Sequence, residues 1–227
     1  MSASVRTAWW IRAYRIAFGL LGILALVWIP LRNMDSASFS LTNYLSYFTI
    51  ESNILTVIVL LVGGTLAPQS PRWQTFRGAV TLYMLITMVV YAVLLADVDV
   101  MLTDKWINDV LHRIVPLVLL LDWLFVAMAA RLRPSPELIG LWLIFPVAYG
   151  VYSLIRGPIV DWYPYPFIDP RTQGYVSLTI GLAVLLVVFV VLAVAMASLG
   201  DLPARCVNAS PKSDPRRARC AGSRRVG

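Results

Sequence analysis

Long apolar runs separated by short polar segments dominate the sequence. They cover residues 9–30, 44–67, 78–100, 110–131, 137–156 and 173–199. An α-helix rises about 1.5 Å per residue, so roughly 20 apolar residues cross the hydrocarbon core of a bilayer. Each helix also closes its own backbone hydrogen bonds, for which lipid offers no partners. The pattern therefore predicts an all-α integral membrane protein, built as a bundle of six transmembrane helices.

The composition agrees with lipid as the main solvent. Of the 227 residues, 59% are hydrophobic and 14% are charged, with a mean hydropathy of +0.75. A soluble domain carries about 25% charged residues. Only short segments separate the six runs within residues 1–199, so we expect one membrane domain and no separate soluble domain. The run at 9–30 is too long for the apolar region of a signal peptide, and we expect a retained first helix.

Basic residues predict the orientation of the helices. Cytoplasmic segments of membrane proteins carry an excess of Lys and Arg. With the N-terminus inside, 14 of the 19 Lys and Arg residues lie on the inner side and five on the outer side. Half of the inner group lies in the tail, but the short inner connections are also basic. We therefore expect both termini to be cytoplasmic, in a multi-pass protein of the cell membrane.

Residues 200–227 form a segment of different composition. It is rich in Arg, Pro, Ser and Gly and poor in large apolar residues, which predicts a disordered basic cytoplasmic tail. Its arginines suit contact with anionic lipid headgroups. No aromatic or folded recognition pattern accompanies them, so we expect membrane lipids as partners and no nucleic acid. The two cysteines, Cys206 and Cys220, also lie here, and their spacing matches no zinc site.

The second apolar run carries a stripe of polar residues near its start. At about 100° per residue, one face of the helix collects Ser46, Thr49, Ser52, Asn53 and Thr56. Such residues commonly hold transmembrane helices together by interhelical hydrogen bonds, so packing is one interpretation and a polar site is the other. Glu51 lies on the opposite face, close enough to the outer end to meet headgroups or a cation such as Arg113 or Arg156.

The fourth run contains the sole histidine, His112. Asn108 and Asp109 precede it by four and three residues, so on a helix either can hydrogen-bond one imidazole nitrogen. Pro116 cannot donate to the carbonyl of residue 112, which predicts a bend. In the predicted topology the second and fourth helices enter from the same outer face. Thr49 and His112 are therefore expected at similar depth in the bundle.

Charged residues inside the apolar runs are costly and need partners. Asp122 lies about 15 Å along the helix axis from His112, so it needs its own partner, such as Tyr149 or Tyr152, or stays protonated. Together with Glu51 and Arg156, it suggests a transporter or channel for a small solute as an alternative function. No internal repeat of the kind common in transporters supports that alternative.

The longest outer loop is RGPIVDWYPYPFIDPRTQGY, residues 156–175. Its four prolines cannot continue a helix, and its aromatic residues are too apolar for a free linker. We expect this loop to pack as a cap over the outer end of the bundle.

Three segments are similar to one known family: YFTIESNIL in the second run, HRIVPLVLLLDW in the fourth, and WYPYPFID before the sixth. Together they resemble the androgen-induced protein and androgen-dependent TFPI-regulating protein family, and in particular its prokaryotic six-helix branch. The resemblance covers roughly residues 10–195. Animal members of that family hydrolyse fatty acid esters of hydroxy fatty acids with an intramembrane threonine nucleophile and a histidine.

By this resemblance the nucleophile is Thr49 and the base is His112, with Ser46, Ser52 and Thr56 as rival hydroxyls. The chemistry further suggests Asp109 or Asn108 as the group that orients the imidazole, and Asn53 as a donor to an oxyanion. The implied function is hydrolysis of lipid (fatty acid) esters. No metal or cofactor is expected, since one histidine and scattered carboxylates do not form a ligand set. A non-catalytic membrane or lipid-binding scaffold is the remaining alternative.

Overall fold

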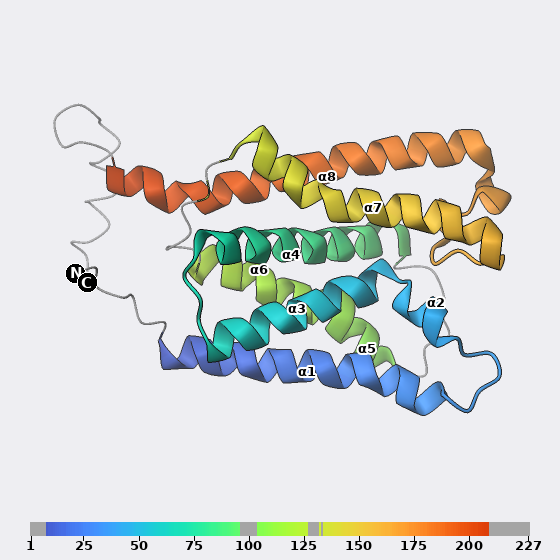
Figure 1. The fold of residues 1–227 in the computed structure, drawn as a ribbon, viewed down its shortest axis with the longest axis horizontal. Helices are drawn as coiled ribbons and strands as arrows, with labels where there is room; N and C mark the ends of the chain where they lie inside the picture. The colour runs from blue at the N-terminus through green and yellow to red at the C-terminus, as the bar shows by residue number, and fades with distance from the viewer. Residues whose placement is uncertain (1–7, 96–103, 127–131, 133, 209–227) are drawn as a thin grey trace.

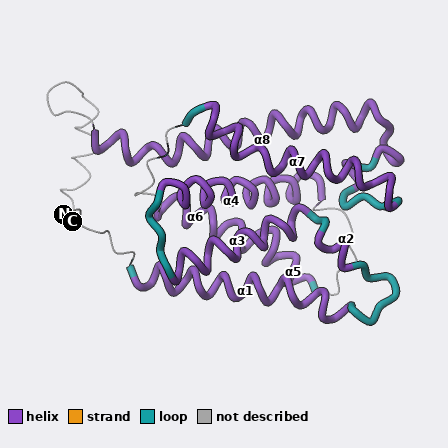
Figure 2. The backbone as a smooth tube through the Cα atoms, in the orientation of Figure 1, coloured by secondary structure: helices purple, strands orange, loops and turns teal. Residues whose placement is uncertain are grey.

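The computed structural model describes residues 8–95, 104–126, 132 and 134–208, and within them the chain is helical without strands. Five helices are long and apolar enough to cross a membrane (Figures 1 and 2). They are α1 (Trp9–Asn33), α3 (Phe48–Thr65), α4 with the π turn η1 (Pro71–Leu95), α7 (Pro136–Val160) and the Pro170–Leu199 part of α8. The chain is therefore an all-α protein whose apolar helices indicate a membrane location.

The fourth apolar run folds as three consecutive helical segments. These are α5 (Lys105–Asp109), the π turn η2 (Val110–Ile114) and α6 (Val115–Val126). Residues 127–131 at the end of this run lie outside the described residues, so the span expected from the fourth run stays a prediction. Two further short elements lie in the part of the chain that the structure describes, α2 (Leu41–Leu45) and the 3₁₀ turn η4 (Pro166–Ile168).

The last helix, α8 (Pro170–Asn208), differs from the expected sixth span at both ends. It is interrupted at Gly174, whose φ of 77° is open to glycine and strained for other residues. It also continues through Asn208, beyond the expected end of the membrane domain at residue 199. The rest of the expected basic tail, residues 209–227, lies outside the described residues.

Helix α1 packs along α3 through glycines, and the two helices lie side by side in Figure 1. A Cβ atom at Gly19 would meet Leu61 Cδ2 at 2.6 Å. A Cβ atom at Gly64 would meet Ile16 Cγ1 at 2.7 Å. Small residues at these positions let the two backbones approach closely, as is common between transmembrane helices. Helix α4 follows on the other side of α3, and α7 and α8 form the opposite side of the bundle.

The connection between α7 and α8 is shorter than the sequence suggested. Helix α7 includes Pro146 and Pro158 and ends at Val160, so the prediction that the prolines end the helix near residue 156 is wrong. Asp161 ends it in the left-handed region, at φ 51°. The loop then turns back: the amide of Trp162 donates to the carbonyl of Gly157 at 3.1 Å. This turn directs the segment 161–169 over the end of the bundle.

Candidate functional site

The Thr49 hydroxyl and the His112 imidazole meet near one end of the bundle. Thr49 stands in the first turn of α3 and is 6% exposed. His112 lies in the π turn η2, immediately before α6. The distance from Thr49 Oγ1 to His112 Nε2 is 3.2 Å. The structure therefore brings the two residues singled out in the sequence to hydrogen-bond distance.

The orientation of His112 comes from a backbone carbonyl and an aromatic ring. His112 Nδ1 lies 3.1 Å from the carbonyl oxygen of Asn108. A proton on Nδ1 donates to that carbonyl and leaves the Nε2 lone pair facing the Thr49 hydroxyl. The Tyr91 ring stacks on the imidazole with a centroid distance of 4.4 Å. The Asn108 side chain donates to the Tyr91 hydroxyl at 2.5 Å, which connects both supports.

Two π turns hold this stacked pair. Tyr91 begins η1 at the end of α4, and His112 lies in η2. In η2 the amide of Val115 donates to the carbonyl of Val110, one residue further back than in an α-helix. Pro116 follows at once, and its ring would clash with a carbonyl four residues earlier in a regular α-helix. The π turn relieves this clash, and such turns are frequent at functional sites.

Asp109 does not orient the histidine. Its carboxylate accepts a hydrogen bond from Arg113 Nη1 at 2.6 Å on the exposed side of the helix. Of the two residues offered as the orienting group, the structure places Asn108 and not Asp109 against the imidazole, through the Asn108 main-chain carbonyl. Arg113 is thereby occupied, and Arg156 donates to Asn43 Oδ1 at 2.7 Å. The two cations considered as partners for Glu51 both have other acceptors.

Asn53 has a packing role in the structure. Its amide nitrogen donates to the carbonyl of Thr49 at 2.8 Å and to the carbonyl of Leu111 at 3.2 Å. An amide has two hydrogens, so neither is left for an oxyanion. The expectation that Asn53 donates to an oxyanion is therefore contradicted. The bond to Leu111 instead connects α3 to η2 next to Thr49 and His112, whereas the bond to Thr49 lies within α3.

The rival hydroxyls of the polar stripe point elsewhere. Ser46 Oγ donates to the carbonyl of Thr42 at 2.7 Å, and Thr56 Oγ1 donates to the carbonyl of Ser52 at 2.9 Å. Ser52 Oγ is buried and has no hydrogen-bond partner among the described residues. Of the hydroxyls on this stripe, that of Thr49 is the one in hydrogen-bond contact with His112.

Tyr165 is a site residue that was not singled out in the sequence. It lies in the loop between α7 and α8, and its hydroxyl is 3.3 Å from Thr49 Oγ1. The same hydroxyl accepts a hydrogen bond from the backbone amide of Thr49 at 3.2 Å. The Tyr165 ring stacks on Phe167 and meets Tyr47 edge-on. The WYPYPFID segment had signalled a cap over the bundle, without showing which of its residues reaches the site.

Two cavities meet at Thr49 and Tyr165, which line both. The first, of about 250 Å³, lies among α3, α4, α7 and α8 and is lined mainly by apolar side chains. The second, of about 450 Å³, lies among α2, α3, η2 and the loop after α7. His112 and Asn108 line the second cavity. The Thr49 hydroxyl therefore stands on a wall shared by an apolar space and a more polar one.

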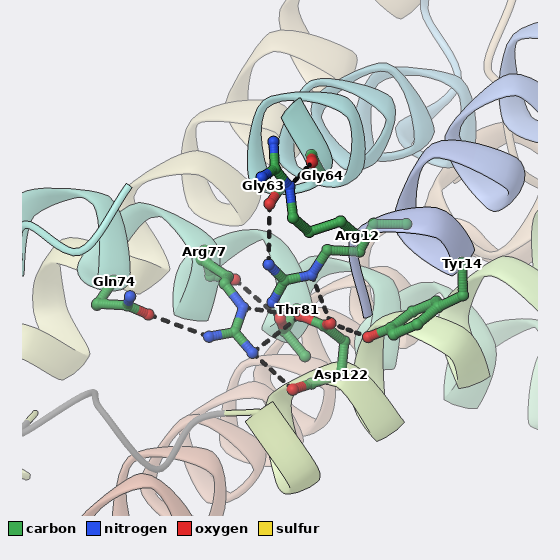
Figure 3. A network of polar contacts seen from close by, with 9 residues as sticks. Arg12, Tyr14, Gly63, Gly64, Gln74, Arg77, Thr81 and Asp122 are labelled. Carbon is green, nitrogen blue, oxygen red and sulfur yellow. Dashed lines mark hydrogen bonds and ion pairs between the residues drawn. The ribbon is translucent and has the colours of Figure 1, made fainter. Parts of the chain in front are cut away.

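Asp122 belongs to a separate buried cluster (Figure 3). Its carboxylate accepts from Arg15 Nε at 2.8 Å and from Arg77 Nε at 2.9 Å, and the Tyr14 hydroxyl also donates to it. The proposed partners Tyr149 and Tyr152 are wrong, since both contact Ser46 instead. Two arginines on α1 and α4 thus neutralise the carboxylate on α6.

The same cluster ties the far end of α3. Arg15 Nη1 donates to the carbonyl of Gly63 at 3.1 Å, and Arg12 Nε donates to the carbonyl of Gly64 at 2.8 Å (Figure 3). These carbonyls belong to the last turn of α3, where no helical partner exists. The charged cluster therefore joins α1, α3, α4 and α6, at the opposite end of α3 from Thr49. In the sequence, Arg15 and Arg77 had been used to assign topology alone.

No protein-family model, curated protein or solved structure matches the chain.

Proposed function

We propose that this chain is a multi-pass membrane hydrolase of lipid esters, with Thr49 as nucleophile and His112 as general base. The contact between Thr49 Oγ1 and His112 Nε2, at 3.2 Å, is the observation that supports the proposal most directly. A threonine hydroxyl becomes nucleophilic when an adjacent base takes its proton, and general bases act at this distance. The family resemblance of the sequence assigns the same two residues.

We further propose six spans with both termini cytoplasmic. The segment 105–126 would belong to the fourth span. The ion pair between Arg15 near the start of α1 and Asp122 near the end of α6 supports an antiparallel arrangement of these two helices. The basic N-terminal segment and tail then face the cytoplasm, and Thr49 and His112 lie toward the outer side. A reporter fused after Gly227 that is reached by impermeant reagents from outside would overturn this orientation.

The reaction proceeds in two balanced steps. The Thr49 oxygen attacks the ester carbonyl carbon while its proton passes to His112 Nε2. The bond from carbon to the alcohol oxygen breaks, and His112 returns the proton to the leaving alkoxide, which leaves an acyl-threonine. Water then attacks the acyl carbon, giving a proton to His112. The Thr49 oxygen leaves as the fatty acid forms and takes that proton back.

Tyr165 supplies a second polar hydrogen close to the reacting atoms. Its hydroxyl lies 3.3 Å from Thr49 Oγ1, so it can donate to an oxygen that becomes negative on the carbon bonded to Thr49. The amide of Thr49 already donates to the same phenol oxygen, which fixes its place. In our proposal Tyr165 takes the oxyanion role that Asn53 does not fill.

The test uses purified full-length protein, a fluorophosphonate probe and a panel of fatty acid esters. Thr49→Val and His112→Ala should lose both labelling and hydrolysis. Thr56→Val is the matched control, because Thr56 lies two turns along the same helix and its hydroxyl bonds to its own helix. The proposal would be refuted if folded wild-type protein is not labelled by the probe and cleaves no ester of the panel. It would also be refuted by a Thr49→Val variant that is as active as the control.

A further inference from the structure

The two cavities that meet at Thr49 differ in one chemically decisive respect. Thr49 and Tyr165 line both, whereas His112 lines the polar cavity and not the apolar one. In ester hydrolysis the group that takes the nucleophile's proton later gives it to the leaving alkoxide. The alcohol half of an ester must therefore lie on the side of His112. The acyl half then extends to the other side of Thr49.

Resting on the proposed function, we propose that the acyl chain occupies the cavity among α3, α4, α7 and α8. The alcohol occupies the cavity beside His112. The substrate class is an ester of a long-chain fatty acid with an uncharged polar alcohol, of which a monoacylglycerol is an example.

The lining of the acyl cavity suits an alkyl chain. Phe48, Ile86, Leu182 and Phe189 contribute to walls that are mostly hydrocarbon. Methylene groups gain dispersion contacts against such walls, and they meet few polar groups there that would need partners.

The acyl cavity also reaches the outside of the bundle. Val147 and Val151 on α7 and Leu186 on α8 line it, and they are 46%, 52% and 46% exposed. In a membrane these outward surfaces face lipid tails. An acyl chain can therefore enter sideways from the bilayer between α7 and α8, without leaving an apolar medium.

The alcohol cavity has a different character. Ser38, Ser40, Asn43 and Asn108 offer hydroxyl and amide groups to it, beside tyrosine and tryptophan rings. None of the described residues that line it is Lys, Arg, Asp or Glu. A charged headgroup would find no counter-ion in this lining, whereas hydroxyl groups find both donors and acceptors. This favours an uncharged polar alcohol.

Gly150 offers a way to fill the acyl cavity selectively. It lies on α7 and lines this cavity, and a Cβ atom added there meets nothing within 4 Å. Gly150→Phe should therefore occupy the space of the acyl chain without disturbing the helix. Gly140→Phe is the matched control, since Gly140 lies on the same helix, has equally open space and lines neither cavity.

The experiment compares acyl-chain profiles from butyryl to palmitoyl glycerol esters. We expect Gly150→Phe to lower kcat/KM for the palmitoyl ester by roughly tenfold or more relative to the butyryl ester. Gly150→Ala should give a smaller shift in the same direction, and Gly140→Phe should keep the wild-type profile. Labelling by a short-chain fluorophosphonate reports that each variant is folded and that Thr49 is intact.

Esters with the long chain on the alcohol instead of the acid test which cavity holds which half of the substrate. Butyrate esters of long-chain alcohols place the long chain on the alcohol side and should be cleaved no worse by Gly150→Phe than by Gly140→Phe. Selective loss of these esters would show that the halves are exchanged and would overturn the assignment. An unchanged profile in a variant that hydrolyses esters would also overturn it. A wild-type protein without labelling or hydrolysis would instead refute the proposed function.

Discussion

The phenol oxygen of Tyr165 contacts Thr49 twice, at 3.2 Å from its backbone nitrogen and 3.3 Å from its Oγ1. Amides in the first turn of a helix have no intrahelical acceptor, so Tyr165 satisfies one of them in α3. The loop between α7 and α8 thereby fixes both the start of α3 and the surroundings of the hydroxyl. A segment far away in the sequence thus determines the geometry at Thr49.

Removal of the Tyr165 hydroxyl should slow the chemical step. We expect Tyr165→Phe to lower kcat by roughly a hundredfold, the usual effect of removing one oxyanion donor, with little change in KM. Steady-state hydrolysis of a short-chain ester measures this. Tyr163→Phe in the same loop is the control, because the Tyr163 ring packs against Gly157 and Arg171, away from Thr49. Equal kcat values for Tyr165→Phe and Tyr163→Phe would show that the Tyr165 hydroxyl does not stabilise the oxyanion.

Neutralisation of Asp122 should destabilise the fold strongly. Asp122→Asn leaves Arg15 and Arg77 buried without a counter-ion, and loss of one partner of a buried pair costs about 3–5 kcal/mol. Asp109→Asn is the control, since its pair with Arg113 is exposed and contributes at most about 1 kcal/mol. Equilibrium unfolding in detergent micelles gives both values. Similar losses for the two variants would contradict a stabilising role for the cluster.

Substitution by alanine at Ser52 and at Asn53, neighbours on α3, should affect the free energy of unfolding differently. Ser52 Oγ is buried without a partner among the described residues, so Ser52→Ala should leave the free energy of unfolding unchanged or slightly higher. Asn53→Ala removes one interhelical hydrogen bond, to the Leu111 carbonyl, and one bond to the Thr49 carbonyl of its own helix, and should cost about 1 kcal/mol. The same unfolding measurement compares them. A clear loss for Ser52→Ala would mean that its hydroxyl has a partner after all.

Acid should weaken the loop that carries Tyr165. Hydrogen bonds from Arg171 lower the pKa of Asp169 from its ordinary value of 3.8. A lowered folded-state pKa contributes stability above the ordinary value, and this contribution is lost as the pH falls through the lowered one. The Tm difference between wild type and Asp169→Asn should therefore shrink below about pH 4. A Tm difference that does not shrink below this pH would contradict a stabilising role for the contact between Asp169 and Arg171.

Much of the fold follows from hydrophobic periodicity. The apolar runs predicted α1, α3, α4, α7 and α8 because a helix is the one simple way to satisfy a backbone in lipid. Helix ends were less predictable. Pro158 stays within α7, because a proline near the last turn removes one hydrogen bond without preventing the helix.

The two central residues of the candidate site, Thr49 and His112, could be predicted from their residue types and their depth along the helices. Thr49 and His112 were placed at similar depth by topology, and the structure places them in contact. The groups that contact these two residues were harder to predict from the sequence. The sequence offered Asn108 as an orienting residue beside Asp109, but periodicity does not reveal that the Asn108 main-chain carbonyl is the acceptor. Tyr165 reaches Thr49 through a loop conformation that no helical pattern encodes.

The ion pairs of Asp122 have a consequence for biogenesis. In the proposed topology Arg15 and Arg77 are synthesised before Asp122, on helices that enter the bilayer first. A buried arginine without a counter-ion costs about 2.5–3.5 kcal/mol on insertion scales, so both side chains must reach toward the headgroups until α6 arrives. Arrival of Asp122 lets them turn inward and draw α1, α4 and α6 together. In the proposed topology, the packing of α1 and α4 against α6 therefore waits for the fourth span, whereas the glycine contacts between α1 and α3 do not depend on it.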